Sequence, residues 1–241
     1  MLAARISYSC SYPPTPTTSY RPSSRKSPPW PAADRQLHQP TQRINVDFWF
    51  EFASTYSYPA AMRVEELAAQ RGIKISWRPL LLGPIFAEYG WQDSPFNLFP
   101  SKGRYMWRDL ERICHDQGIA FCRPSEFPRN GLLAARVACR FADSPWLPSF
   151  VRAVYRSNFE KDLDISTSAT VAHCIASAGE DPATVIKEAQ STESKDMLRA
   201  QTEEASRLGI FGAPSFVVGT ELFWGNDRLE NALNWAAEHH G

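Results

Sequence analysis

Alternation of apolar and polar residues defines the first folded element of the chain. Between residues 44 and 53, every second residue is a large apolar one: Ile44, Val46, Phe48, Phe50 and Phe52. This period of two is typical of a β-strand. A helical pattern follows over about residues 57–71, and residues 73–78 alternate again before Pro79. A strand, a helix and a second strand in close succession form a βαβ unit, whose two strands we expect to be parallel.

The middle of the chain has a helical pattern that prolines divide into pieces. The best helical stretches are about residues 102–117, 130–142, 146–160, 168–178 and 182–190. A longer helix is predicted over about 193–208, followed by two short strands over 215–218 and 221–224 and a last helix from near residue 227. The order βαβ, helices, αββα predicts an α/β protein with a thioredoxin-like fold and an inserted all-helical domain.

Three parts of the chain are expected. Residues 44–82 and 191–241 form the thioredoxin-like domain, and residues 83–190 form the inserted helical domain. Residues 1–43 are rich in proline, serine and arginine, with Asp34 as their only acid, and we expect a disordered N-terminal extension. The alternative is an organelle transit peptide, which has a similar composition. The expected location is therefore cytoplasmic, with a mitochondrion or another organelle as the alternative.

Composition excludes several classes of function. The 26 basic and 26 acidic residues balance, so nothing suggests nucleic acid as a partner. No apolar run is long enough to span a membrane. The five cysteines form no C-x-x-C pair, which argues against a zinc site and favours separate thiols in a reducing compartment. We therefore expect no metal, no membrane and no nucleic acid.

The first candidate site is the stretch from Ser54 to Ser57, between the first strand and the first helix. Thioredoxin folds carry C-x-x-C at this turn, where backbone N–H groups and the helix dipole stabilise a thiolate. A serine hydroxyl does not ionise usefully, but it can donate a hydrogen bond to the thiolate of another molecule. The turn thus suits an external thiol, and we expect no dithiol redox activity. Alternatively, both serines only cap the helix.

The second candidate site is Ala213-Pro214, immediately before a predicted strand. Proline is unusual there because it cannot donate to the ladder of a sheet. A cis Ala213–Pro214 bond would leave the N–H and C=O groups of Ala213 open to an extended peptide such as glutathione. The alternative is a trans proline in an ordinary loop.

The third candidate site is the turn at Asn226 and Asp227, after the last strand. A carboxylate such as Asp227 could hold the α-amino group of a γ-glutamyl residue, and the following helix N-terminus could hold its carboxylate. Asp227 could equally be a helix cap only.

Five motifs in order resemble one family. They are Val46-Asp-Phe-Trp-Phe-Glu-Phe-Ala-Ser54, Trp77-Arg-Pro-Leu-Leu-Leu-Gly83, Lys102-Gly-Arg-Tyr105, Gly209-Ile-Phe-Gly-Ala-Pro214 and Phe223-Trp-Gly-Asn-Asp-Arg228. Over about residues 44–240 the chain resembles the 2-hydroxychromene-2-carboxylate isomerase family, which is related to kappa-class glutathione transferases and to DsbA-type oxidoreductases. The resemblance implies glutathione as the cofactor.

The resemblance also assigns roles to residues. Ser54 matches the serine that hydrogen-bonds the glutathione sulfur, and Ala213 with Pro214 matches the backbone clamp. Asn226 and Asp227 match the γ-glutamyl-binding turn. Lys102 matches a lysine of the inserted domain that contacts glutathione in the family.

Two departures from the family pattern are clear. Thr55 stands where the family usually has proline. Gly90-Trp91 stands where the family has Gly-Asn, and Asn97 is the candidate to replace that asparagine.

The resemblance implies reversible addition of glutathione thiolate to an aromatic enone or chromene carboxylate, with net isomerisation. Aromatic residues of the insertion could wall this small aromatic substrate, or they could be ordinary core: Phe86, Tyr89, Trp91, Phe96, Tyr105 and Trp107. The alternatives are kappa-type glutathione transfer or peroxide reduction, and a non-catalytic module that binds glutathione or peptides. A homodimer is a further open alternative.

Overall fold

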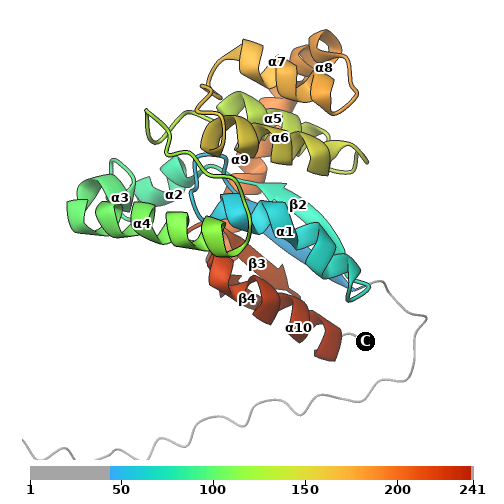
Figure 1. The fold of residues 1–241 in the computed structure, drawn as a ribbon. Helices are drawn as coiled ribbons and strands as arrows, with labels where there is room; N and C mark the ends of the chain where they lie inside the picture. The colour runs from blue at the N-terminus through green and yellow to red at the C-terminus, as the bar shows by residue number, and fades with distance from the viewer. Residues whose placement is uncertain (1–43, 240–241) are drawn as a thin grey trace, which may run out of the picture. The chain divides into compact units, whose positions relative to one another are not determined.

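A mixed four-stranded sheet in the order β2-β1-β3-β4 organises the fold (Figure 1). Strand β1 is parallel to β2 and antiparallel to β3, and β3 is antiparallel to β4. The strands are β1 (Asn45–Phe50), β2 (Lys74–Pro79), β3 (Ser215–Val218) and β4 (Glu221–Trp224). The predicted parallel βαβ unit is therefore confirmed, and the two predicted short strands pair as a hairpin.

The computed structural model describes residues 44–239. The N-terminal extension expected over residues 1–43 lies outside the described residues. Within the described part, the thioredoxin-like fold with helices inserted after β2 is the architecture that the sequence predicts.

Both faces of the sheet are covered by helices. Val46, Phe48 and Phe50 belong to a core shared with α1 (Ser57–Ala69) and α10 (Leu229–His239). Trp49 alternates with these residues and lies on the opposite side of β1. That side is buried as well, because Trp49 is 2% exposed in a second core. The partners of Trp49 there include Ile85 of α2 (Leu82–Glu88) and Ala205 of α9 (Thr192–Arg207).

The segment between β2 and α9 is helical, as expected. Its helices are α2, α3 (Pro95–Leu98), α4 (Pro100–Asp116), α5 (Leu132–Arg140), α6 (Leu147–Phe159), α7 (Ser168–Ser177) and α8 (Pro182–Ala189). The short helices α2 and α3 were not predicted. They are too short for a helical period to stand out, and Gly90 and Pro100 interrupt the pattern around them.

Helix α6 of the insertion holds the carboxyl end of β1. The Tyr155 ring packs on Phe52 with ring centroids 5.3 Å apart, and its hydroxyl donates to the Glu51 carbonyl at 2.9 Å. The Asn158 amide donates to the Phe52 carbonyl at 3.2 Å. The insertion thus shares one core with the sheet and fixes the backbone where the turn to α1 begins.

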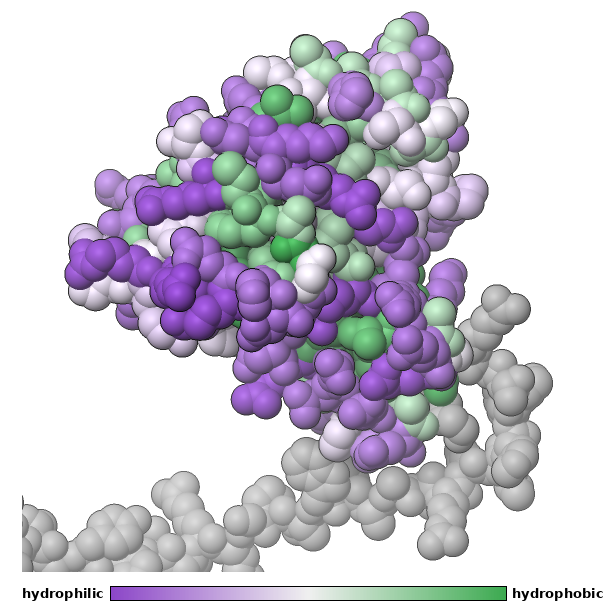
Figure 2. Space-filling view, in the orientation of Figure 1, coloured by the Kyte–Doolittle hydropathy of each residue, from purple (hydrophilic) through white to green (hydrophobic). Residues whose placement is uncertain are grey.

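Hydrophilic side chains cover most of the face seen in Figure 1, with an apolar patch near its middle (Figure 2). A short 3₁₀ turn (Asn226–Arg228) precedes α10. Over residues 44–239, no helix has both the length and the apolar character needed to cross a membrane.

Substitution of Phe48 tests this core. Its ring centroid lies 5.2 Å from those of Trp77 and Phe216, and the side chain is fully buried. Phe48→Ala should lower the free energy of unfolding by about 3–5 kcal/mol, because it leaves a cavity at the centre of the sheet. Urea unfolding measures the change. Leu208→Ala, at a position that is 40% exposed, is the control and should cost under about 1 kcal/mol. Equal losses in the two variants would contradict the central position of Phe48.

Candidate functional site

A cavity of about 850 Å³ lies where the β1–α1 turn, the helices α2 to α4 and the segment before β3 meet. Ser54, Thr55, Lys102, Ala213 and Pro214 all line it, so three sequence-distant motifs converge on one space. Most of the remaining wall is aromatic or apolar. The aromatic residues are Tyr56, Phe86, Tyr89, Trp91, Phe96, Tyr105, Phe127, Phe211 and Trp224.

Ser54 is at the centre of the hydrogen bonds in this site. Its backbone N–H donates to the Glu51 carbonyl at 3.0 Å, which closes the turn after β1. Its hydroxyl donates to the Ala213 carbonyl at 2.8 Å and accepts from the Ser57 N–H at 3.3 Å. The bond to Ser57 fits the alternative that Ser54 caps the helix. The bond to Ala213 goes beyond capping and joins the two predicted sites.

Ser57 has a different environment. It is the first residue of α1 and is fully buried. Within residues 44–239 its hydroxyl has no hydrogen-bond partner. The two serines of the turn are therefore not equivalent, and only Ser54 lines the cavity.

The Ala213–Pro214 peptide bond is cis. The Pro214 carbonyl accepts from the Gly225 N–H at 2.9 Å. The expectation that the Ala213 carbonyl would be open is wrong, because the Ser54 hydroxyl is within reach and donates to it. The Ala213 N–H makes no hydrogen bond within the described part of the chain and remains a donor at the cavity wall.

Trp224 of β4 covers the chain just before this clamp. A Cβ on Gly212 would lie 2.6 Å from the Trp224 indole nitrogen, so only glycine allows this approach. The Phe211 and Trp224 rings lie 4.8 Å apart, and both are partly exposed at the cavity. Neither aromatic residue was assigned to the site from the sequence, although each lies within one of the five motifs.

Lys102 lies in the first turn of α4. Its ammonium is 4.8 Å from the centroid of the Phe99 ring, an arrangement that favours a cation. Among the described residues, Lys102 is the only basic side chain that lines the cavity. Asn97 does not line it: the exposed Asn97 amide donates to the Asp93 carboxylate at 3.1 and 3.2 Å. The Asn97 amide, which the family resemblance assigned to glutathione binding, is therefore bound to Asp93 instead.

Asn226 and Asp227 follow Gly225, which lines the cavity, but do not line it themselves. Asn226 is buried, and its side-chain oxygen accepts from Arg63 at 3.0 Å, which ties the turn to α1. Asp227 is exposed and lies 3.7 Å from the Arg228 guanidinium. Gly225 has a φ of 112°, and a Cβ there would collide with the Asp227 carboxylate. The turn is therefore specific in shape, with the Asp227 carboxylate against Gly225.

The predicted aromatic wall is largely in place. Of the six aromatic residues of the insertion, Trp107 does not line the cavity; it is buried, with its ring 4.9 Å from Phe127. Phe127 lines the cavity instead, beside a second cis bond at Phe127–Pro128. Tyr56 also lines it and donates its hydroxyl to Asp109 at 3.0 Å.

Glu51 is a site residue that the sequence analysis missed. It is the only acidic side chain among the described residues lining the cavity, and its carboxylate accepts from the Ala53 N–H at 3.0 Å. Burial raises the pKa of Glu51 from 4.5 to about 7, against the opposing effect of the Ala53 and Ser54 N–H groups. The signal available in the sequence was an acid three residues before Ser54, within the first of the five motifs.

No thiol of the described chain lines the cavity. Cys114, Cys139 and Cys174 are buried and unpaired, and burial raises the pKa of the Cys114 thiol to about 12 and of Cys139 to about 11. Cys122 is exposed. Residues 44–239 hold no cluster of three potential metal ligands. Any thiol chemistry in this cavity therefore requires a thiol from outside residues 44–239.

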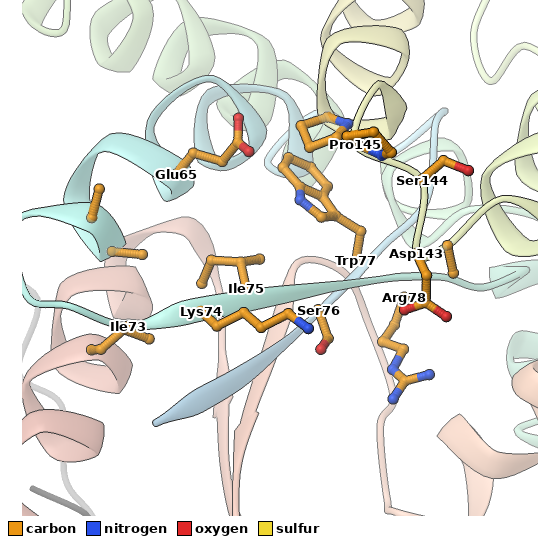
Figure 3. A pocket seen from close by; sticks show the side chains of 14 residues that line it. Glu65, Ile73, Lys74, Ile75, Ser76, Trp77, Arg78, Asp143, Ser144 and Pro145 are labelled. Atoms are coloured by element: carbon orange, nitrogen blue, oxygen red, sulfur yellow. The ribbon is translucent and has the colours of Figure 1, made fainter. Parts of the chain in front are cut away.

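A separate hollow of about 500 Å³ follows the edge strand β2 (Figure 3). Its charged groups include Glu65, which is paired with Arg152, and Arg78, which is 3.5 Å from Asp47. None of the predicted site residues lines it. The larger cavity is thus the candidate site.

Comparisons with known proteins agree with this geometry. A family model described as the DSBA-like thioredoxin domain matches residues 45–234. The chain is 30% identical over 209 residues to a 2-hydroxychromene-2-carboxylate isomerase of Pseudomonas sp. (strain C18), covering 80% of this chain and 92% of the relative. It is 25% identical to human glutathione S-transferase kappa 1, covering 77% and 87% of the two chains.

A solved structure of 2-hydroxychromene-2-carboxylate isomerase superposes with a TM-score of 0.70 at 25% identity. The alignment covers 80% of this chain and 95% of that structure. Sequence and structural similarity thus extend over the sheet and the inserted helices together.

The raised pKa of Glu51 makes stability depend on pH. The folded protein holds the Glu51 proton more tightly than the unfolded chain, so this stabilisation is present below pH 4.5 and is lost as pH rises to about 7. Glu51→Gln resembles the protonated acid and should not suffer that loss. Relative to the wild type, the free energy of unfolding of Glu51→Gln should therefore rise by up to about 3 kcal/mol across this range. Urea unfolding at several pH values checks it; a difference independent of pH would contradict the buried, proton-holding Glu51.

Proposed function

Because this chain belongs to the DSBA-like thioredoxin domain family, and within it to the 2-hydroxychromene-2-carboxylate isomerase family, we propose that it is a glutathione-dependent isomerase. The substrate class is an aromatic enone or chromene carboxylate. The observation that carries the proposal is the convergence of Ser54, Ala213 and Lys102 on one aromatic-walled cavity, which no thiol of residues 44–239 lines.

The residues present fit glutathione. Ala213 lines the cavity, and its N–H, which has no partner in the described chain, can pair with a peptide carbonyl. The Ser54 hydroxyl and the N-terminal end of α1 favour a negative charge at the sulfur position. Lys102, in the part of the wall that α4 forms, supplies a positive charge for a carboxylate of the tripeptide. Asp227 is exposed two residues after Gly225, which lines the cavity, and is assigned to the γ-glutamyl amino group.

When bound, glutathione supplies a thiolate that adds reversibly to a conjugated double bond. The protein stabilises the negative charge on sulfur through the Ser54 hydroxyl and orients the peptide through Ala213. The aromatic wall, including Phe86, Trp91 and Tyr105, excludes water and stacks on a planar substrate. A serine at position 54 suits these tasks better than a cysteine, because a protein thiolate there would compete with glutathione for addition to the double bond.

Substitution of the two serines separates their roles. Ser54→Ala removes a hydrogen bond to a thiolate, of about 1.5–3 kcal/mol, so the thiol pKa of bound glutathione should rise by about 1 to 2. Ser57→Ala should change it little, because the buried Ser57 hydroxyl does not line the cavity. Thiolate absorbance against pH measures both variants. A rise with Ser57→Ala alone would reverse the two roles.

The experiment that tests the function is a calorimetric titration with reduced glutathione, followed by conversion of 2-hydroxychromene-2-carboxylate. We expect binding, and isomerisation in which glutathione is not consumed. Lys102→Met should weaken glutathione binding by about 10- to 100-fold, as expected for the loss of one charged hydrogen bond. Arg104→Met, on the same helix but outside the cavity wall, is the matched control and should bind normally.

Three outcomes would contradict the proposal in different ways. Stable glutathione conjugates would indicate a transferase. Binding without turnover of any aromatic enone would indicate a non-catalytic glutathione module. Absence of glutathione binding would show that glutathione is not the cofactor of this protein.

A further inference from the structure

Glu51 stands in a wall shared by two hollows. One side is the aromatic cavity with Ser54, and the other is a smaller hollow of about 330 Å³. The smaller hollow is lined partly by the exposed polar residues Gln92, Asp93 and Asn130. A carboxylate in this position has an apolar reaction space on one side and a polar route toward solvent on the other.

The Glu51 carboxylate has no positively charged partner within residues 44–239. The Ala53 N–H holds one of its oxygens, one residue from Ser54. Arg129 also lines the smaller hollow, but its guanidinium is already bonded to Asp162, Asn158 and Ser125. An unpaired and desolvated carboxylate is a stronger base than an exposed one, consistent with its raised pKa.

We propose that the Glu51 carboxylate accepts the proton of the thiol that binds at Ser54. The inference rests on the proposed function. One proton moves from sulfur to a carboxylate oxygen, the electron pair stays on sulfur, and no further reactant is needed. Protonation also removes the negative charge of Glu51 from the neighbourhood of the new thiolate. When the thiol re-forms, the same proton returns.

Other titratable groups face the same two hollows and bear on any pH dependence. They are Tyr56 in the turn, Tyr89 just after α2, Asp93 before α3, Lys102 and Tyr105 of α4, and Arg129 before α5; Tyr155 of α6 donates to the Glu51 carbonyl. Burial raises the pKa of Tyr56 and Tyr155 above that of an ordinary tyrosine, so both hydroxyls stay protonated at neutral pH. Among the lining acids, only Glu51 also borders the site of the thiol.

The test counts the protons exchanged when reduced glutathione binds, by calorimetry in buffers of different ionisation enthalpy, together with thiolate absorbance. It is done with the full chain, just above the pKa that Glu51 has in the free protein. The wild type should form thiolate and release almost no proton, because the negative charge of the new thiolate raises the pKa of the Glu51 carboxyl further, so that Glu51 keeps the proton. Glu51→Gln should either release one proton for each thiolate formed or fail to form thiolate. S-methylglutathione, which has no thiol proton, should show no exchange with either protein.

Glu88→Gln is the matched control, because Glu88 is exposed on α2 and lines neither hollow; it should behave as the wild type. Equal proton release and equal thiolate formation in the wild type and Glu51→Gln would overturn the assignment of Glu51 while leaving the proposed function intact. Failure of the wild type to bind glutathione would instead overturn the proposed function and, with it, this inference. Glu51→Asp, which keeps the acid, should restore proton capture at least in part.

Discussion

The hydrogen bond from the Ser54 hydroxyl to the Ala213 carbonyl joins two segments that are 159 residues apart in the sequence. It depends on the antiparallel pairing of β1 with β3, which sets Trp49 opposite Ser215 and so brings the ends of both segments together. The bond satisfies two polar groups in a largely apolar cavity, where leaving them unpaired would be costly. A thiol ligand that takes the Ser54 hydroxyl must therefore give the Ala213 carbonyl a new donor.

The inserted helices make this arrangement rigid on one side and build the cavity on the other. Tyr155 and Asn158 of α6 hold the carbonyls of Glu51 and Phe52, so the backbone just before Ser54 cannot drift. Helices α2 to α4 add the aromatic wall, while α9 returns the chain to the sheet and buries Trp49 through Ala205. Within one insertion, α6 thus fixes the end of β1, and α2 to α4 shape the cavity.

Local patterns predicted the elements of the sheet and most helices, because periodicity and turn residues act over a few positions. They placed Ser54 and Pro214 at the site through the order of elements. They could not place Trp49, since its burial depends on α9, more than a hundred residues away. Glu51 was missed for the same reason: its exposure and pKa follow from tertiary packing. Asn97 was assigned by analogy, and a neighbouring Asp93, which pairs with it, decided its orientation.

The central claim is that a thiol peptide binds at the junction of Ser54 and Ala213. A crystal structure with reduced glutathione tests it most directly. The account predicts the sulfur within hydrogen-bonding distance of the Ser54 hydroxyl, and a peptide N–H of glutathione in place of that hydroxyl on the Ala213 carbonyl. Glutathione bound elsewhere, or bound here with the Ser54–Ala213 hydrogen bond unchanged, would contradict it.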